Sequence, residues 1–346
     1  MLILSLLTGL ATAAEVHVFR SGDSIESVAT QIGDPTLAPT IRELNGLQTG
    51  EQPPVGTVLT LPDTDAISQP GQVLTVSGTG SLTPPGGGAP QPLVEGAFLI
   101  VGTTVCTGPD SYAAVRLASV SDCSDEDDIT MLPETCLVLD SATARPDRRS
   151  SVVSVTSGSV RIGATDGGTA VAVRTPAGIT TGESGGFRVA VEETSTRSEA
   201  VTGDVAVLAQ GTETEVARGF GVRPPDGAVP GDLVKLLPPG TPILPDAGAR
   251  LLVPDFAWTP VPRALGYRVE LAEGPDMVSL VRRTEVGPPK WSPTQLFLPY
   301  DVTTLHWHII PFDRLGFEGI PSEVRPVRFP RGVGDAPGVK EGAGGE

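Results

Sequence analysis

The chain has 346 residues, which is room for two or three domains. Charged residues make up 19% and aromatic residues 4%, while there are 42 glycines and 34 prolines, so we expect a mainly β multidomain protein with many short strands. The net charge of −17 argues against nucleic acid and anionic membrane surfaces as partners.

The N-terminal residues look like a secretion signal. Residues 2–7 are almost continuously apolar, and Ala11-Thr12-Ala13 fits a small-x-small cleavage site. The run is too short to cross a bilayer, and no other stretch is long enough for a transmembrane span. We therefore expect residues 1–14 to be a signal peptide and the mature chain to be exported to the periplasm or cell envelope. An apolar N-terminal strand or helix is the alternative.

Residues 15–63 alternate between strand-like and helix-like patterns. Apolar and polar residues alternate from Val16 to Arg20, as in a strand, and a Gly-Asp-Ser turn follows. Asp23 or Ser24 is placed to cap a helix whose apolar positions are spaced three and four residues apart. A second short helix over 39–44 ends at Asn45-Gly46, and a returning strand follows it. These patterns predict a small α+β module with the order βααβ.

This segment resembles a LysM module, a βααβ unit that binds N-acetylglucosamine-containing glycans such as peptidoglycan. The matching residues are Gly22, Asp23, Ser24, Ile25, Val28, Ala29, Leu44, Asn45, Pro54, Gly56, Leu59 and Pro62. The resemblance implies a glycan site between residues 22–27 and 45–54. Its candidate glycan-binding residues are Gly22, Asp23, Ser24, Ile25, Asn45, Gly46 and Leu47.

Two features qualify that site. The family often has Tyr or Trp just after the first turn, where this chain has Glu26, so one sugar-packing surface is missing. Gly22, Asp23 and Asn45 also have a purely structural interpretation as turn and cap residues. For Asp23 and Asn45 we favour the structural interpretation, with binding carried by the backbone of the loops.

Residues 64–92 have few residues that could build a core, and we predict a linker with one short strand over 73–76. From residue 93 short β runs separated by Gly, Asp and Ser predict a β-roll or solenoid-like domain that ends at 223.

These runs resemble the FecR domain family. The matching marks include Leu132-Pro133, Gly158-Ser159-Val160-Arg161, Val173-x-Thr175-Pro176-Ala177-Gly178, Phe187-Arg188-Val189 and Gly203-Asp204-Val205. The founding member of that family is a membrane-spanning signal transducer. This chain has no transmembrane helix in its sequence pattern, so that mode of signalling is not expected here.

The three cysteines, Cys106, Cys123 and Cys136, all fall in this domain. An oxidising compartment would allow one disulfide with one thiol left over. Cys123 lies in a hydrophilic loop, and pairing with Cys106 or with Cys136 would hold that loop in place. We expect one disulfide that involves Cys123; the sequence does not fix the pairing, and three free thiols are the alternative.

The C-terminal third begins with a second Pro-rich linker over 224–246. Residues 247–330 then resemble a fibronectin type III-like β-sandwich, with Phe256-x-Trp258 and Tyr267-x-Val269-x-Leu271 as early core strands and Leu305-x-Trp307-x-Ile309 as a later one. Residues 331–346 have the composition of a disordered tail.

Candidate chemistry is sparse. Ser184 lies in a Gly-x-Ser-x-Gly sequence, but a strand pattern follows it, where a nucleophile elbow needs a helix. His306 and His308 share one strand face without a third metal ligand, and we expect both to face solvent. The acidic run over 122–128 lacks the spacing of a calcium loop, so we expect neither a metal site nor a cofactor.

These patterns favour a non-enzymatic, exported cell-envelope protein that binds peptidoglycan through the LysM-like module. The β domains would serve as a scaffold or as a platform for an envelope protein partner. Two alternatives remain open: a peptidoglycan-remodelling hydrolase or accessory factor, and an envelope-sensing FecR-like regulator.

Overall fold

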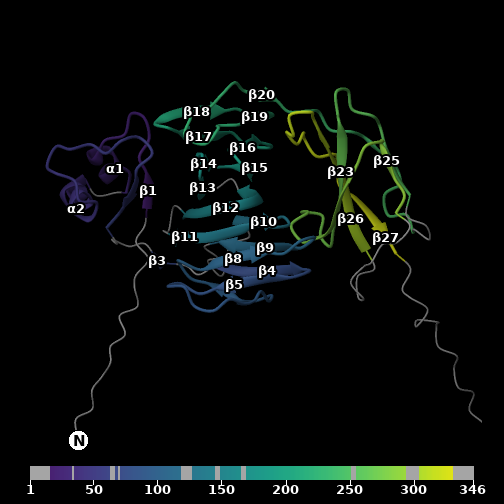
Figure 1. The fold of residues 1–346 in the computed structure, drawn as a ribbon, viewed down its shortest axis with the longest axis horizontal. Helices are drawn as coiled ribbons and strands as arrows, with labels where there is room; N and C mark the ends of the chain where they lie inside the picture. Colours follow the sequence, from purple (N-terminus) through teal and green to yellow (C-terminus); the bar gives the residue numbers. More distant parts are fainter. Residues whose placement is uncertain are drawn as a thin grey trace, which may run out of the picture. The chain divides into compact units, whose positions relative to one another are not determined.

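The protein is described by a computed structural model (Figure 1). It describes residues 16–32, 35–62, 67–68, 71–117, 127–144, 149–164, 169–250, 255–293 and 304–329. The chain divides into two compact units, with the boundary between Leu236 and Leu237. The expected signal peptide, the expected tail, Cys123 and most of the acidic run lie outside the described residues. None of the helices that the structure describes is long and apolar enough to cross a membrane.

The first unit begins with the βααβ module that the sequence predicts (Figure 1). Ser24 caps the first helix, and the apolar residues of both helices pack with those of the returning strand around Ile25, Val28 and Ile41, which are fully buried. The elements are β1 (Val16–Val18), α1 (Ile25–Gln31), a 3₁₀ turn (Pro35–Leu37), α2 (Ala38–Leu44) and β2 (Val58–Thr60).

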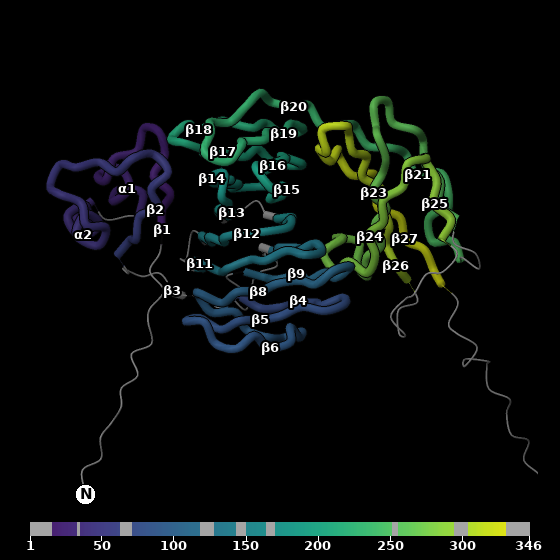
Figure 2. Tube along the Cα trace, in the orientation of Figure 1, coloured from purple at the N-terminus to yellow at the C-terminus, as the bar shows by residue number. Residues whose placement is uncertain are grey.

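The rest of this unit is a β domain of stacked strands (Figure 2). It is made of two sheets that share strand β12 (Arg149–Ala164). One sheet, called sheet B, runs in the order β6 (Gln91–Pro92), β5 (Gly80–Thr83), β8 (Thr104–Thr107), β11 (Cys136–Ala144), β12, β13 (Thr169–Thr175), β14 (Gly178–Gly182), β17 (Val205–Ala209) and β18 (Thr212–Val216), with β3 (Ile67–Ser68) beside β11.

The other, sheet C, runs in the order β7 (Phe98–Leu99), β4 (Gly71–Ser77), β9 (Tyr112–Leu117), β10 (Asp127–Met131), β12, β15 (Gly185–Glu192), β16 (Ser195–Ala200), β19 (Phe220–Val222) and β20 (Val234–Lys235). Apolar residues of both sheets, such as Val153 and Val173 from sheet B and Ile129 and Val189 from sheet C, form one core. A mainly β architecture is thus confirmed.

The linker expected over 64–92 is wrong in part: the one short strand expected over 73–76 lies within β4, but β5 and β6 are further strands and all three belong to the β domain. β4 pairs with β9, β5 pairs with β8, and Val73 is buried in the common core. The runs are short and rich in Gly, Thr and Ser, so their local sequence carries little apolar signal. Backbone pairing with strands farther along the chain is what places them in the sheets.

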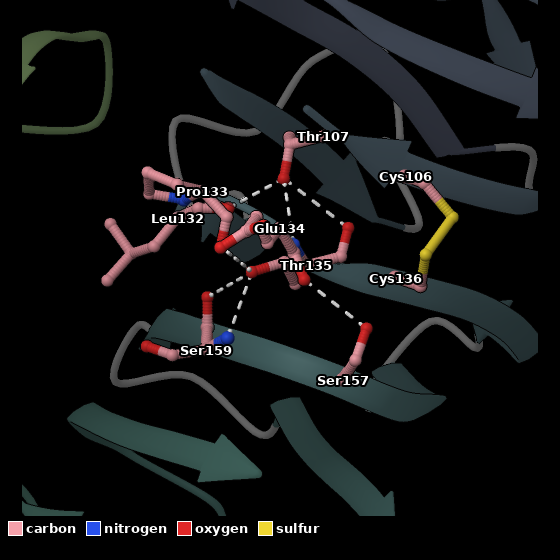
Figure 3. Close-up of a disulfide and its surroundings, with 9 residues drawn as sticks. All are labelled: Cys106, Thr107, Leu132, Pro133, Glu134, Thr135, Cys136, Ser157 and Ser159. Atoms are coloured by element: carbon pink, nitrogen blue, oxygen red, sulfur yellow. Dashed lines mark hydrogen bonds between the residues drawn. A yellow bond between two sulfur atoms is a disulfide. The ribbon is translucent and has the colours of Figure 1, made fainter. Parts of the chain in front are cut away.

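β12 passes from sheet B to sheet C at Gly158, where the backbone has φ +80°. A Cβ at this position would lie 2.3 Å from Thr135 Oγ1 and 2.5 Å from Thr135 Cα, so only glycine fits. The Thr135 hydroxyl donates to Ser159 O (3.1 Å) and accepts from Ser159 N–H (2.9 Å) (Figure 3). Thr107 Oγ1 in turn accepts from Thr135 N–H (3.1 Å) and donates to Leu132 O (2.6 Å), which ties β8 to the same corner.

A disulfide joins Cys106 and Cys136 beside this corner (Figure 3). The two residues are direct cross-strand partners in the pairing of β8 with β11. The expectation that the bridge involves Cys123 is therefore wrong. Strand register brings Cys106 and Cys136 together, and register cannot be read from the spacing of cysteines along the chain.

We predict that Cys136→Ser lowers the free energy of unfolding of the oxidised protein by about 2–4 kcal/mol, because the bridge closes a loop with a sequence separation of 30 residues. Urea titration followed by circular dichroism measures the change. Cys123→Ser is the matched control and should leave the linked peptide containing Cys106 and Cys136 intact in non-reducing digests. A control variant that loses this linked peptide would contradict the assigned pairing.

The βααβ module packs directly on the outer face of sheet B. Val18 lies with Val152, Ala172, Ile179 and Leu208 in one apolar cluster, and the partly buried side chains around it are Val16, Val55 and Val58. Two weak polar contacts flank this cluster, from Arg20 to Glu183 (3.4 Å) and from Ser21 N–H to Glu213 (3.4 Å). The module therefore has an apolar contact with the β domain through its β1–β2 face.

The second unit is a sandwich of two sheets. One contains β21 (Pro242–Leu244), β22 (Phe256–Trp258) and β25 (Lys290–Trp291); the other contains β24 (Leu280–Val286), β23 (Gly266–Ala272), β26 (Thr304–Phe312) and β27 (Arg325–Arg328). Trp258 and Trp307 are buried between them, as expected, and Phe256 packs edge-on to Trp307 with ring centroids 4.9 Å apart. The linker expected over 224–246 is wrong in part, because it contributes β20 to the first unit and β21 to the second.

A network of charged side chains lies on the other face of the β24–β23–β26–β27 sheet. Glu270 is fully buried and accepts from Arg283 (2.7 Å), while its second oxygen lies 2.8 Å from His308 Nε2. Glu318 accepts from both Arg268 and Arg283. The expectation that His308 faces solvent is wrong: its cross-strand neighbour Glu270 supplies a partner for the ring, which lets it be buried.

We predict that Arg283→Met destabilises the second unit by about 3–5 kcal/mol, because it leaves two buried carboxylates without their shared cation. All three tryptophans, Trp258, Trp291 and Trp307, lie in this unit, so urea unfolding followed by tryptophan fluorescence reports on it alone. Arg282→Met, at the exposed neighbouring position, should change stability by less than about 0.5 kcal/mol. If both variants lowered the free energy of unfolding equally, the buried ion pairs of Arg283 would not be the cause of the destabilisation.

Candidate functional site

The candidate site consists of two loops at one end of the βααβ module. Residues 22–27 lead from β1 into α1, and residues 45–54 lead from α2 towards β2. Gly22, Glu26, Gly46 and Gln52 are exposed on them. The structure thus brings the two segments of the expected site together in one module.

In the first loop the side chains hold the turn in shape. Asp23 Oδ2 accepts from Arg20 N–H (2.8 Å) and lies 2.8 Å from His17 Nε2. Ser24 forms a reciprocal capping box with Ser27, at 3.0 Å and 2.8 Å. Ile25 is fully buried in the module core. The exposed parts of this loop include Gly22 and the Glu26 side chain.

Asn45 has a similar structural role in the second loop. Its amide nitrogen donates to Ile41 O and Thr60 O, each at 2.7 Å, and its oxygen accepts from Thr60 N–H at 2.7 Å. The side chain therefore ties the end of α2 to β2. Gly46 turns the chain away from the helix with φ +66°, and Leu47 is partly buried against the core.

We predict that Asn45→Ala opens the module, because three hydrogen bonds are lost and two carbonyls and one N–H lose a partner. The local free energy of opening should fall by about 1–3 kcal/mol. Hydrogen-exchange mass spectrometry on peptides from residues 38–60 measures it.

Gln48→Ala serves as the control for that substitution, because Gln48 is exposed in the same loop and its bond to Glu51 uses only the backbone N–H. Exchange that stays unchanged in Asn45→Ala would contradict the structural role of Asn45.

Three polar residues that the sequence did not single out for this site connect the two loops. Gln52 Oε1 accepts from Ile25 N–H (3.0 Å), and Gln52 Nε2 is 3.4 Å from Glu26 Oε2. Arg42, nearly buried on α2, donates to the other oxygen of Glu26 (2.5 Å). This hydrogen bond from Arg42 is the main cause of the lowered pKa of Glu26. Glu26, Arg42 and Gln52 lie far apart in the sequence, so no local pattern connects them. The one sequence signal was Glu26, which stands where the LysM family often has an aromatic residue.

The other candidate residues do not assemble into a site. Ser184 lies between the strands β14 and β15, so no helix follows it. His306 Nδ1 contacts Glu273 O (3.1 Å), while His308 belongs to the buried network with Glu270. Among the residues that the structure describes, no group of three or more His, Cys, Asp or Glu side chains could hold a metal ion.

Comparison with known proteins adds little to this picture. No family model matches the chain, and no curated protein matches it. Two solved structures described as "a putative anti-sigma factor" from Parabacteroides distasonis ATCC 8503 are similar over 38% of this chain and 58% of theirs, with 14% identity and TM-scores of 0.30 and 0.29. The match spans less than two thirds of those chains, and TM-scores of this size do not establish a shared fold.

Proposed function

We propose that this chain is an exported cell-envelope protein that binds peptidoglycan, or a related N-acetylglucosamine glycan, through the loops 22–27 and 45–54. In this proposal the chain performs no chemistry on the glycan. The β domain and the sandwich act as a scaffold or as a platform for an envelope partner.

One contact carries the proposal. The Ile25 N–H, at the base of the first loop, is hydrogen-bonded by the carboxamide of Gln52, and the same carboxamide approaches Glu26 with its nitrogen. An N-acetyl group has the same functional group, with one carbonyl acceptor and one N–H donor. An acetamido group of a glycan that displaced the exposed Gln52 side chain could take over both contacts without any change in the backbone.

The way the module is attached supports the same interpretation. Its β1–β2 face packs on sheet B through Val18 and its neighbours, so that this face is used within the chain. The exposed residues of the loops, among them Gly22, Gly46 and Gln52, remain accessible. A module held in this way can present its loops to a polymer without a flexible tether.

The disulfide supports export. Disulfides persist in oxidising compartments such as the periplasm and are rare in the cytosol. The bridge between Cys106 and Cys136 therefore fits a mature protein in the cell envelope.

We predict that Gln52→Ala strengthens binding to an N-acetylglucosamine tetramer, because the Ile25 N–H no longer has an internal competitor. Loss of one competing hydrogen bond corresponds to an about two- to tenfold lower Kd. Gln52→Trp fills the space between the loops and should weaken binding by at least a similar factor. Isothermal titration calorimetry on the full-length protein measures both.

Thr40→Trp, at an exposed position of α2, controls for the effect of a bulky surface residue. A glucosamine tetramer controls for the acetyl group and should bind much more weakly. If neither the tetramer nor purified peptidoglycan in a sedimentation assay binds the wild-type protein, the proposal fails. Release of soluble muropeptides would instead favour the hydrolase alternative.

A further inference from the structure

The outer edge of strand β1 has backbone groups that no strand of the module uses. Among the strands that the structure describes, β1 pairs with β2 alone, in the register Val16 with Thr60, His17 with Leu59 and Val18 with Val58. Phe19 exchanges hydrogen bonds with the β2 side, from Phe19 N–H to Thr57 O (2.8 Å) and from Gly56 N–H to Phe19 O (2.7 Å).

In an antiparallel ladder, successive residues direct their N–H and C=O groups alternately towards and away from the partner strand. Since Phe19 and therefore His17 face β2, the peptide groups of Val16 and Val18 point away from it. No residue that the structure describes hydrogen-bonds to the main chain of Val18, although Val18 is only 9% exposed. Unpaired N–H and C=O groups along an open strand edge are a template for another strand.

A cavity of about 380 Å³ lies beside this edge, which is within the range of small-ligand sites. The module lines it with β1 and with the polar side chains of His17, Asp23 and Gln31. Sheet B lines it with small side chains, including Ala170, Ala172 and Ser150. Both sides of the cavity mix apolar and polar side chains, because the module also contributes Leu61, and sheet B also contributes Val152, Thr181 and the charged Glu183.

The two carboxylates at the cavity, Asp23 and Glu183, favour an occupant with a cationic side chain. Asp23 Oδ2 is engaged by His17 Nε2 and by Arg20 N–H, and the Arg20 side chain also lines the cavity. Glu183 lines the cavity with a side chain that is 69% exposed, and its contact with Arg20 is long, at 3.4 Å. An exposed ion pair of this length contributes little to stability, so the Glu183 carboxylate can pair with a cationic side chain of a partner instead.

We propose that the outer edge of β1 is a strand-addition site for an extended segment of a protein partner. The segment pairs its backbone with Val16 and Val18. Alternate side chains, small and apolar, face Ala170 and Ala172 of sheet B, while the others are polar and include a lysine or arginine near Glu183. The cavity shares Asp23 with the first glycan loop, whereas the strand edge at Val16 and Val18 lies outside both loops, so strand addition does not depend on glycan binding.

The test uses the full-length protein and synthetic eight-residue peptides in which alanine or valine alternates with serine or lysine. We expect binding, measured by fluorescence anisotropy, together with slower hydrogen exchange of the Val18 amide, measured by NMR. Peptides N-methylated at every second residue provide a matched pair, because only one phase of amides faces β1. Methylation in that phase should weaken binding about tenfold or more, and methylation in the other phase should not.

Glu183→Gln should weaken the lysine-containing peptides by about two- to tenfold without affecting those with serine alone. Glu193→Gln, at an exposed position of the same domain, should affect neither. The proposal is overturned if no peptide of the set binds, if binding leaves the Val18 amide unchanged, or if both methylation phases act equally. Protection of Val18 by an N-acetylglucosamine tetramer would assign the cavity to a glycan and would also overturn it.

Discussion

The passage of β12 from one sheet to the other is the constraint on which the first unit depends. Its N-terminal half pairs with β11 and β13 in sheet B, and its C-terminal half pairs with β10 and β15 in sheet C. Residue 158 at this bend has to be glycine, because Thr135 occupies the space that a side chain would need. The Thr135 hydroxyl also forms two hydrogen bonds with the backbone of Ser159, just beyond the bend. Thr107 and the disulfide between Cys106 and Cys136 hold β8 and β11 at the same corner, so that these two strands and β12 meet at one fixed point.

The strand that forms this corner also contacts the βααβ module. The sheet B half of β12 carries Val152, whose side chain lies in the apolar cluster with Val18 of the module. Gly56, in the turn before β2, allows the module to approach closely, because a Cβ there would lie 3.2 Å from the Leu208 side chain. The same sheet thus supports the β domain on one face and receives the module on the other. A module held on a sheet differs from one on a flexible linker in that its orientation to the domain is set by packing.

The side chains that hold the shape of the candidate site are not the groups left to contact a ligand. Asp23 forms its hydrogen bonds within the turn, Ser24 caps the helix, and Asn45 links α2 to β2. What remains for a ligand is backbone, together with Gln52 and Glu26 between the loops. The proposed recognition of an acetamido group suits such a surface, because peptide groups and the acetamide have matching donors and acceptors.

The sequence alone was sufficient for features that depend on neighbours within one element. The spacing of Ile25 and Val28 and the alternation around Trp258 and Trp307 define helix faces and strand faces locally, and the structure agrees with them; of the two predicted cap residues, Asp23 and Ser24, the structure has Ser24. Features set by register between distant strands needed the tertiary structure: the pairing of Cys106 with Cys136, the strands within 71–92, and the burial of His308 against Glu270. The same holds for the contact of Gln52 with Ile25, which joins two loops 27 residues apart. A local pattern shows which face of an element is apolar, but only the packed chain determines which residue lies opposite.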